Sequence, residues 1–162
     1  VNSPVKGDMT LLIFYITLAL GVSFLCSILE AVLLSTPQTY VNILENEGKR
    51  TAEMWAHLKD DDSVRPLTAI LTLNTIAHTM GAAGVGSQVQ QIWGVEVLTA
   101  ASAILTLAVL FLSEIIPKTL GAAYWKRLST PSAYLLTWFK KSLFFMIGPI
   151  QTITNILPKS RR

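Results

Sequence analysis

Two acidic side chains, Glu30 and Glu114, lie within long apolar runs, where a charge is costly unless another group pairs with it. Neutral oxygen donors stand close to both of them. Ser23 and Ser27 precede Glu30 at spacings that place all three on one face of a helix. Ser113 directly precedes Glu114. Ionisable groups inside a membrane segment indicate function by default, and this pattern points to the binding of a cation.

A second polar group, Asn74, His78 and Gly81, repeats the same spacing in another apolar run. Hydroxyl, amide and carboxylate oxygens are ligands for Mg²⁺ or Ca²⁺ rather than for thiophilic metals. His78 and Cys26 are the softer donors nearby, and they are too few for a zinc site. One carboxylate among neutral oxygens suits transport, because several carboxylates would hold the ion too tightly for release.

Pro117 adds a backbone oxygen to this set. It has no amide hydrogen, so the carbonyl of Ser113, four residues earlier, loses its helical partner beside Glu114. In lipid a free carbonyl is tolerated where it lines a cavity or meets a partner such as a cation. At about 1.5 Å per residue, Ser27, Asn74 and Glu114 fall at similar depth in the inner half of the bilayer. One shared site is therefore geometrically permitted.

Each of these residues also has a structural explanation. Serines in membrane helices often hydrogen-bond to their own helix, and Asn74 and His78 can serve to pack helices together. Glu114 and Lys118 are spaced i, i+4 and can neutralise one another. Glu30 can pair with Lys118 or His78 and lock the bundle. Taken singly the residues favour these explanations, whereas taken together they favour a cation site.

The elements that must position these residues are apolar helices. The 162 residues are 51% hydrophobic and 14% charged, against about a quarter charged in a typical soluble domain. Three largely uncharged stretches predict transmembrane helices at about 9–35, 67–93 and 97–125. We therefore expect an all-α integral-membrane fold, in a single transmembrane domain over residues 1–162.

Two further segments are expected at the cytosolic membrane surface. The polar connection 36–66 predicts juxtamembrane helices, and its aspartates at 60–62 are interpreted as a charged loop end. Residues 126–158 hold Lys140 and Lys141 among apolar and aromatic side chains, which predicts an interfacial amphipathic belt rather than a fourth crossing. Basic residues gather in the connection and towards the C-terminus, so we expect the N-terminus outside and the C-terminus in the cytosol.

Three segments resemble the transmembrane domain of the CorC/cyclin M (CNNM) magnesium transporters: residues 23–31, residues 73–79, and the sequence Ser-Glu-Ile-Ile-Pro-Lys at 113–118. The resemblance covers essentially the whole chain, and the Glu-Ile-x-Pro-Lys sequence is its most specific part. It implies a multi-pass homodimer in the plasma or inner membrane that exports Mg²⁺, with Na⁺ as the proposed counter-ion. It also implies a cytosolic CBS-pair module, which these 162 residues do not contain.

By position, the resemblance assigns coordination of the cation to Ser23, Ser27, Asn74, Gly81, Ser113 and Glu114. Four residues are expected to support them: Glu30, His78, Pro117 and Lys118. Lys118 is expected to hold the Glu114 carboxylate or to compete with the ion. The family commonly has glycine where this chain has Ser113, so we expect a backbone role there rather than a hydroxyl role.

The sequence therefore predicts transport of Mg²⁺, with Na⁺ as a second candidate ion, by a protein embedded in the lipid bilayer and without a nucleic-acid partner. The alternative is a non-transporting membrane anchor or cation sensor for a regulatory cytosolic module. An enzyme is not expected, because His57 and His78 lie far apart in the sequence and no nucleophile–base pair is visible.

Overall fold

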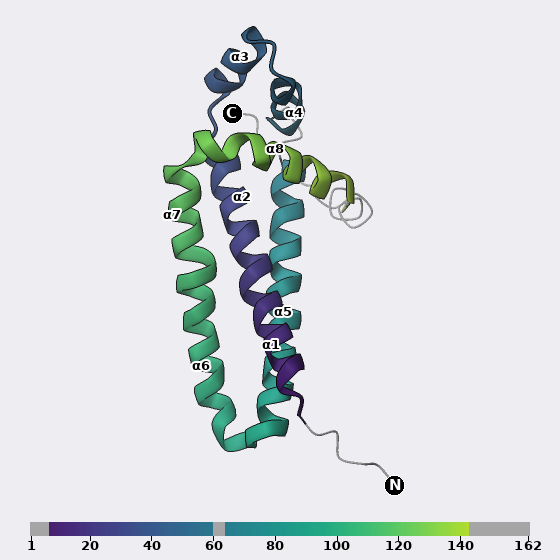
Figure 1. Cartoon of the computed structure of the whole chain (residues 1–162), viewed down its shortest axis with the longest axis vertical. Coiled ribbons are helices and arrows are strands. Elements are labelled where there is room, and N and C mark those ends of the chain that lie inside the picture. The colour runs from purple at the N-terminus through teal and green to yellow at the C-terminus, as the bar shows by residue number, and fades with distance from the viewer. Residues whose placement is uncertain (1–6, 60–63, 143–162) are drawn as a thin grey trace, which may run out of the picture.

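The computed structural model describes residues 7–59 and 64–142. Every regular element in these two ranges is helical. Three long helical stretches run along one another, and shorter helices gather at one end of them (Figure 1). The predicted all-α architecture is confirmed for this part of the chain.

The first long stretch is a continuous apolar helix of 27 residues, Met9–Ser35. It consists of α1 (Met9–Thr17), the π-helical segment η1 (Leu18–Val22) and α2 (Ser23–Ser35). The Asp8 side chain caps it by accepting a hydrogen bond from the backbone N–H of Thr10 at 2.8 Å. At about 1.5 Å per residue this helix exceeds the ~30 Å hydrocarbon core, as the sequence predicted for 9–35.

The third long stretch is a second apolar helix, Val95–Ala123, of 29 residues. Its parts are the 3₁₀ turn η2 (Val95–Val97), α6 (Leu98–Ala108), the π-helical segment η3 (Val109–Ile115) and α7 (Ile116–Ala123). The helix continues past Pro117, whose missing N–H falls in the first turn of α7, directly after the π segment. The structure thus contains both apolar helices expected at 9–35 and 97–125.

Between them runs α5 (Val64–Trp93), a helix of 30 residues. It is long enough to cross a bilayer, but it is more polar than its two neighbours, which are the helices of the described chain that are both long and apolar enough to span. The helix predicted at 67–93 is therefore present, and its crossing stays a prediction. It begins at Val64, so the predicted connection 36–66 is shorter than expected.

The shorter helices lie at one end of the long ones. The connection contains α3 (Gln38–Asn46) and α4 (Arg50–Lys59), with Gly48 at φ 65° between them. Helix α8 (Trp125–Ser142) lies across the ends of the long helices (Figure 1). It accounts for the first part of the belt predicted at 126–158, while residues 143–158 and the aspartates 60–62 lie outside the described residues.

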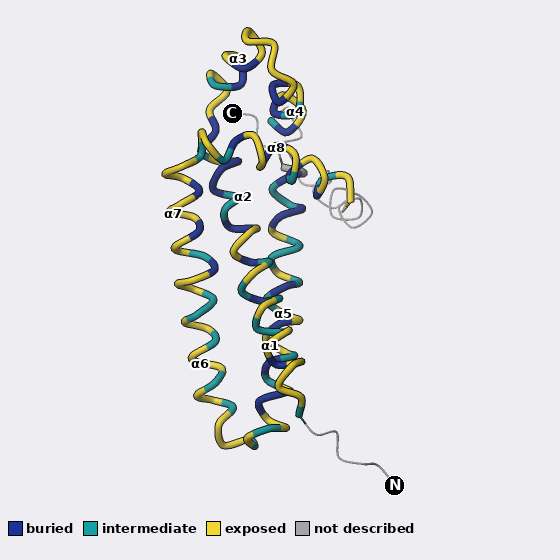
Figure 2. The backbone as a smooth tube through the Cα atoms, in the orientation of Figure 1, coloured by how far each residue is buried: buried dark blue, intermediate teal, exposed yellow. Residues whose placement is uncertain are grey.

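Buried residues concentrate where α2, α4, α5 and α8 meet (Figure 2). Trp55, Leu136 and Ile70 are each at most 1% exposed in this core. In contrast, α6 contains no buried residue, and Ile104 on it is 69% exposed. An apolar surface of this extent needs lipid or another protein chain against it, which agrees with a membrane-embedded fold.

Candidate cation site between the three long helices

The two π-helical segments lie against each other and join the first and third helices. The Ser113 hydroxyl on η3 donates a hydrogen bond to the carbonyl oxygen of Leu20 on η1, at 3.1 Å. Segments of π-helix are rare and occur often at functional sites. Because the Ser113 hydroxyl proton is used in this contact, the role expected for Ser113 towards a ligand remains a backbone one.

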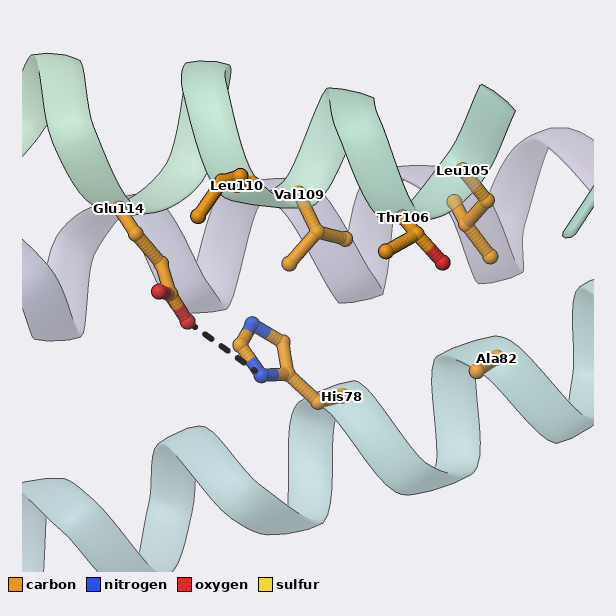
Figure 3. A pocket seen from close by; sticks show the side chains of 7 residues that line it. All are labelled: His78, Ala82, Leu105, Thr106, Val109, Leu110 and Glu114. Atoms are coloured by element: carbon orange, nitrogen blue, oxygen red, sulfur yellow. Dashed lines mark ion pairs between the residues drawn. The ribbon is translucent and has the colours of Figure 1, made fainter. Parts of the chain in front are cut away.

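His78 connects all three long helices at the level of these segments. Its Nε2 atom lies 2.6 Å from Ser23 Oγ on α2, and its Nδ1 atom lies 3.9 Å from Glu114 Oε1 on η3 (Figure 3). The first contact is a hydrogen bond, whereas the second is too long to be one. Ser23, His78 and Glu114 therefore meet at one depth. The sequence predicted a shared depth for Ser27, Asn74 and Glu114 instead. The sequence placed His78 in a supporting position, and the structure places it centrally.

Two buried oxygens near this point have no hydrogen-bond partner within the described ranges: Ser27 Oγ and Asn74 Oδ1. Ser27 is one turn beyond Ser23 on α2, and Asn74 is one turn before His78 on α5. The two helices run in opposite directions, so both steps lead from the Ser23–His78 contact towards the α8 end (Figure 1). The two unpartnered oxygens thus lie at the same level, on the faces that already touch.

A buried oxygen without a partner costs roughly 1–3 kcal/mol. Two such oxygens at one level, on facing helices, call for a polar partner such as water or a cation. They are hard donors of the kind that Mg²⁺ prefers. Neither Ser27 nor Asn74 hydrogen-bonds back to its own helix in the structure, so the structural explanation offered for the serines does not apply to Ser27.

Lys118 occupies a different position from the expected one. Its Nζ atom lies 3.2 Å from Glu30 Oε2, so it joins α7 to α2. The expectation that Lys118 holds the Glu114 carboxylate is therefore wrong for this structure, and the ion pair between Lys118 and Glu30, one of the structural alternatives, is present. The reason is helix rotation: α7 packs closely on α2, and this brings the Lys118 side chain to Glu30.

Gly81 and Pro117 shape the backbone around the site. A Cβ atom on Gly81 would overlap Ala19 of η1, so glycine permits the close approach of α5 to the first helix. Pro117 is buried directly after η3. Coordination by a carbonyl near Gly81 stays a prediction, because close packing already accounts for the glycine.

A cavity of about 320 Å³ lies between α5 and the third helix. His78 and Glu114 are at one end of it, and Leu105, Thr106 and Val109 are among the other lining residues (Figure 3). The Glu114 side chain is 33% exposed. In the described ranges no three His, Cys, Asp or Glu side chains form a group that could hold a metal. A cation here would depend on one carboxylate and neutral oxygens.

Sequence reasoning missed two features of this arrangement. The role of the Leu20 carbonyl could not be recognised from the sequence, because it depends on the tertiary contact with Ser113. Thr106 lines the cavity, but its hydroxyl donates to the carbonyl of Ser102 on its own helix, so it was indistinguishable from an ordinary helix threonine. The π-helical turn of η3 had one signal in the sequence, Pro117.

Comparison with known proteins gives a family match over most of the chain. The family described as the cyclin M (CNNM) transmembrane N-terminal domain matches residues 14–161. Among curated proteins, the UPF0053 protein sll1254 of Synechocystis sp. is 29% identical over 154 residues, which are 93% of this chain and 42% of that relative. The chain therefore spans about two fifths of the length of this relative. No solved structure matches the chain at a significant level.

Proposed function

The chain belongs to the CNNM transmembrane-domain family, and from that premise we propose that it binds and transports Mg²⁺ between its three long helices. The family is one of membrane transporters associated with Mg²⁺ rather than of enzymes. The ligands in this proposal are Ser23, Ser27, Asn74, Gly81, Ser113 and Glu114.

The observation that carries the proposal is the pair of buried, unpartnered oxygens on Ser27 and Asn74. Mg²⁺ requires several oxygen ligands at about 2.0–2.1 Å and gives up its water reluctantly. Glu114 supplies the negative charge that offsets part of this dehydration. Ser27 and Asn74 replace water oxygens without adding charge, so the ion can leave again.

The residues around these ligands hold them in place. Ser23 is fixed by His78, and the Ser113 hydroxyl fixes η3 against η1. The Glu30–Lys118 ion pair lies one further turn towards the α8 end. Because the two charges neutralise each other, the Glu30 carboxylate does not compete with Glu114 for the cation, and the Lys118 amino group does not repel it. In the proposed mechanism this pair keeps the Glu30 carboxylate away from the ion.

The remaining parts of the proposal concern the whole protein. We propose export of Mg²⁺ from the cytosol coupled to Na⁺ entry, by a homodimer whose transmembrane part is joined to a cytosolic CBS-pair module. The exposed apolar surface of α6 supports a location within lipid and offers area for a second copy.

Thermal melting in detergent tests the site. Mg²⁺ should raise the melting temperature of the parent protein, because a ligand that binds the native state stabilises it. Glu114→Gln should abolish this rise. Glu96→Gln is the matched control, since Glu96 is an exposed carboxylate on η2, remote from the site. An equal rise with Mg²⁺ in Glu114→Gln and in the parent would disprove coordination by Glu114.

Flux into liposomes separates a transporter from a membrane anchor or cation sensor. The full-length protein, reconstituted with a Mg²⁺-sensitive dye inside the vesicles, should transport Mg²⁺ down its gradient, and an opposing Na⁺ gradient should change the rate. Binding of Mg²⁺ without flux in any Na⁺ gradient would favour the sensor. Flux that is independent of Na⁺ would remove only the coupling from the proposal.

A further inference from the structure

A second cavity, of about 260 Å³, lies between α4 and α8, apart from the cation site. On α4 it is lined by Arg50, Glu53 and His57, with Met54 and Leu58 supplying apolar wall; on α8 it is lined by Thr137 and Lys140. The α4 residues recur at i, i+3, i+4, i+7 and i+8, so they form one face of that helix. Two helices thus present basic and polar side chains to one hollow.

Among the residues that the structure describes, the positive charge in this cavity exceeds the negative charge. The amino group of Lys140 donates to the backbone carbonyl of His57 at 3.1 Å, which positions the charge without neutralising it. Neither Arg50 nor Lys140 takes part in an ion pair among the described residues. Glu53 is the one carboxylate in the described part of the lining, where two permanent positive charges face its negative charge.

The position of α8 places this cavity at the edge of the membrane. Helix α8 lies across the ends of the long helices (Figure 1). Its buried side chains include Ala133, Leu136 and Phe139. Its exposed side carries Tyr134 and Trp138, which are 48% and 61% exposed. Tyrosine and tryptophan are enriched at the membrane–water interface, and basic residues there attract anionic lipids.

The geometry points to a binding site for the headgroup of an anionic phospholipid in the cavity between α4 and α8. Arg50 and Lys140 bind the phosphate from two sides, since both cations form short, charge-assisted hydrogen bonds to phosphate oxygens. The Thr137 hydroxyl donates to the carbonyl of Ala133 at 2.7 Å, so Thr137 contributes an acceptor oxygen to the lining and not a donor. The Glu53 carboxylate accepts hydrogen bonds from hydroxyl groups at the far end of the headgroup, which selects a hydroxylated headgroup such as glycerol. This site is independent of the proposed Mg²⁺ transport.

The test measures lipid binding by the full-length protein in detergent. Melting temperature and native mass spectrometry are followed against short-chain phosphatidylglycerol, phosphatidylcholine of the same chain length, and inorganic phosphate. Phosphatidylglycerol should stabilise the protein and remain bound, and the other two should not. The double variant Arg50→Gln/Lys140→Gln should bind phosphatidylglycerol at least ~10-fold more weakly, because two charge-assisted bonds are lost.

The matched control is Arg127→Gln/Lys141→Gln, which removes the same two kinds of charge from exposed positions on α8 outside the cavity lining. It should retain affinity within about threefold. An equal loss in both double variants would overturn the site in favour of diffuse attraction. Stabilisation by inorganic phosphate alone would overturn its assignment to a lipid.

A measurement on the parent protein tests the site even if the variants do not fold. Photoreactive phosphatidylglycerol should label peptides from α4 and α8. Labelling confined to the long apolar helices would contradict the proposal whatever the variants do.

Discussion

Lys118 shows how the rotation of a helix decides the role of a single side chain. Its i, i+4 spacing from Glu114 allowed a pair within one helix, but its amino group lies 3.2 Å from Glu30 of the first helix instead. The Glu30 side chain is 17% exposed and that of Lys118 45%. The pair therefore combines a nearly buried carboxylate with a half-exposed cation, and loss of the cation matters more than it would at a surface.

We expect Lys118→Met to lower stability by about 1–2 kcal/mol, because it leaves the Glu30 carboxylate unpaired. The double variant Glu30→Gln/Lys118→Met should recover part of this loss. Thermal melting of Glu30→Gln, of Lys118→Met and of the double variant gives the coupling free energy between the two side chains. Lys141→Met, at an exposed position on α8, is the control. Strictly additive effects would mean that the pair contributes nothing.

Substitution of two serines one turn apart should have opposite effects on stability. Ser23 Oγ is hydrogen-bonded to His78, whereas Ser27 Oγ is buried without a partner. In the absence of Mg²⁺, Ser23→Ala should cost about 1 kcal/mol, and Ser27→Ala should be neutral or stabilising because it removes an unsatisfied oxygen. With Mg²⁺ present, Ser27→Ala should show a smaller rise in melting temperature than the parent. A full rise in that variant would mean that Ser27 is not a ligand.

At the scale of the helices, glycine sets the distance between α5 and the first helix. A Cβ atom on Gly81 would overlap Ala19, whereas a Cβ atom on Gly86 would lie 3.7 Å from a Leu98 side-chain atom, in ordinary contact. Gly81→Ala should therefore destabilise the protein by about 1–3 kcal/mol through overpacking. Gly86→Ala should change the melting temperature little. Equal effects of the two substitutions would show that α5 is not held at this distance.

The extents of the helices followed from the sequence because they depend on local composition. Uncharged runs gave both apolar helices to within about two residues, and the position of α5 was correct except for its first three residues. The π-helical segments were not predicted, because a shift from i+4 to i+5 bonding depends on the neighbouring helix; η1 forms opposite η3, with Ser113 bonded to Leu20. Side-chain partners such as Glu30 and Lys118 were undetermined for the same reason.

Some features of the candidate site could likewise be predicted from the sequence, and others could not. The approximate depth of Ser27, Asn74 and Glu114 could be estimated, because rise per residue is constant along a helix. However, the structure places Glu114 beside His78, one turn from the level of Ser27 and Asn74. Which oxygens are left without a partner could not be predicted, since this depends on the facing side chain at each position. His78 provides the clearest case: it bonds to Ser23 and leaves Ser27, one turn away, unpartnered.

At the scale of the whole molecule, the direction of the chain decides whether α5 crosses the membrane. The first and third helices run towards the same end of the molecule, where α3, α4 and α8 lie (Figure 1). Between them α5 returns the chain to the opposite end, where η2 forms the turn. If both apolar helices cross the bilayer in this arrangement, α5 must cross as well, in spite of its polar residues. Its 30 residues extend about 45 Å, beyond the ~30 Å core.

This topology predicts which positions a membrane-impermeant reagent reaches. Cysteines are introduced singly into a Cys26→Ala background, at Glu47 in the α3–α4 turn, at Glu96 in η2 and at Arg127 on α8, all exposed. Because basic residues favour the cytosol, Glu96→Cys should react with an impermeant maleimide in intact cells. Glu47→Cys and Arg127→Cys should react only after permeabilisation. Reaction of Glu47→Cys and Glu96→Cys from the same side would show that α5 does not cross, and Asn74 and His78 would then lie outside the hydrocarbon core.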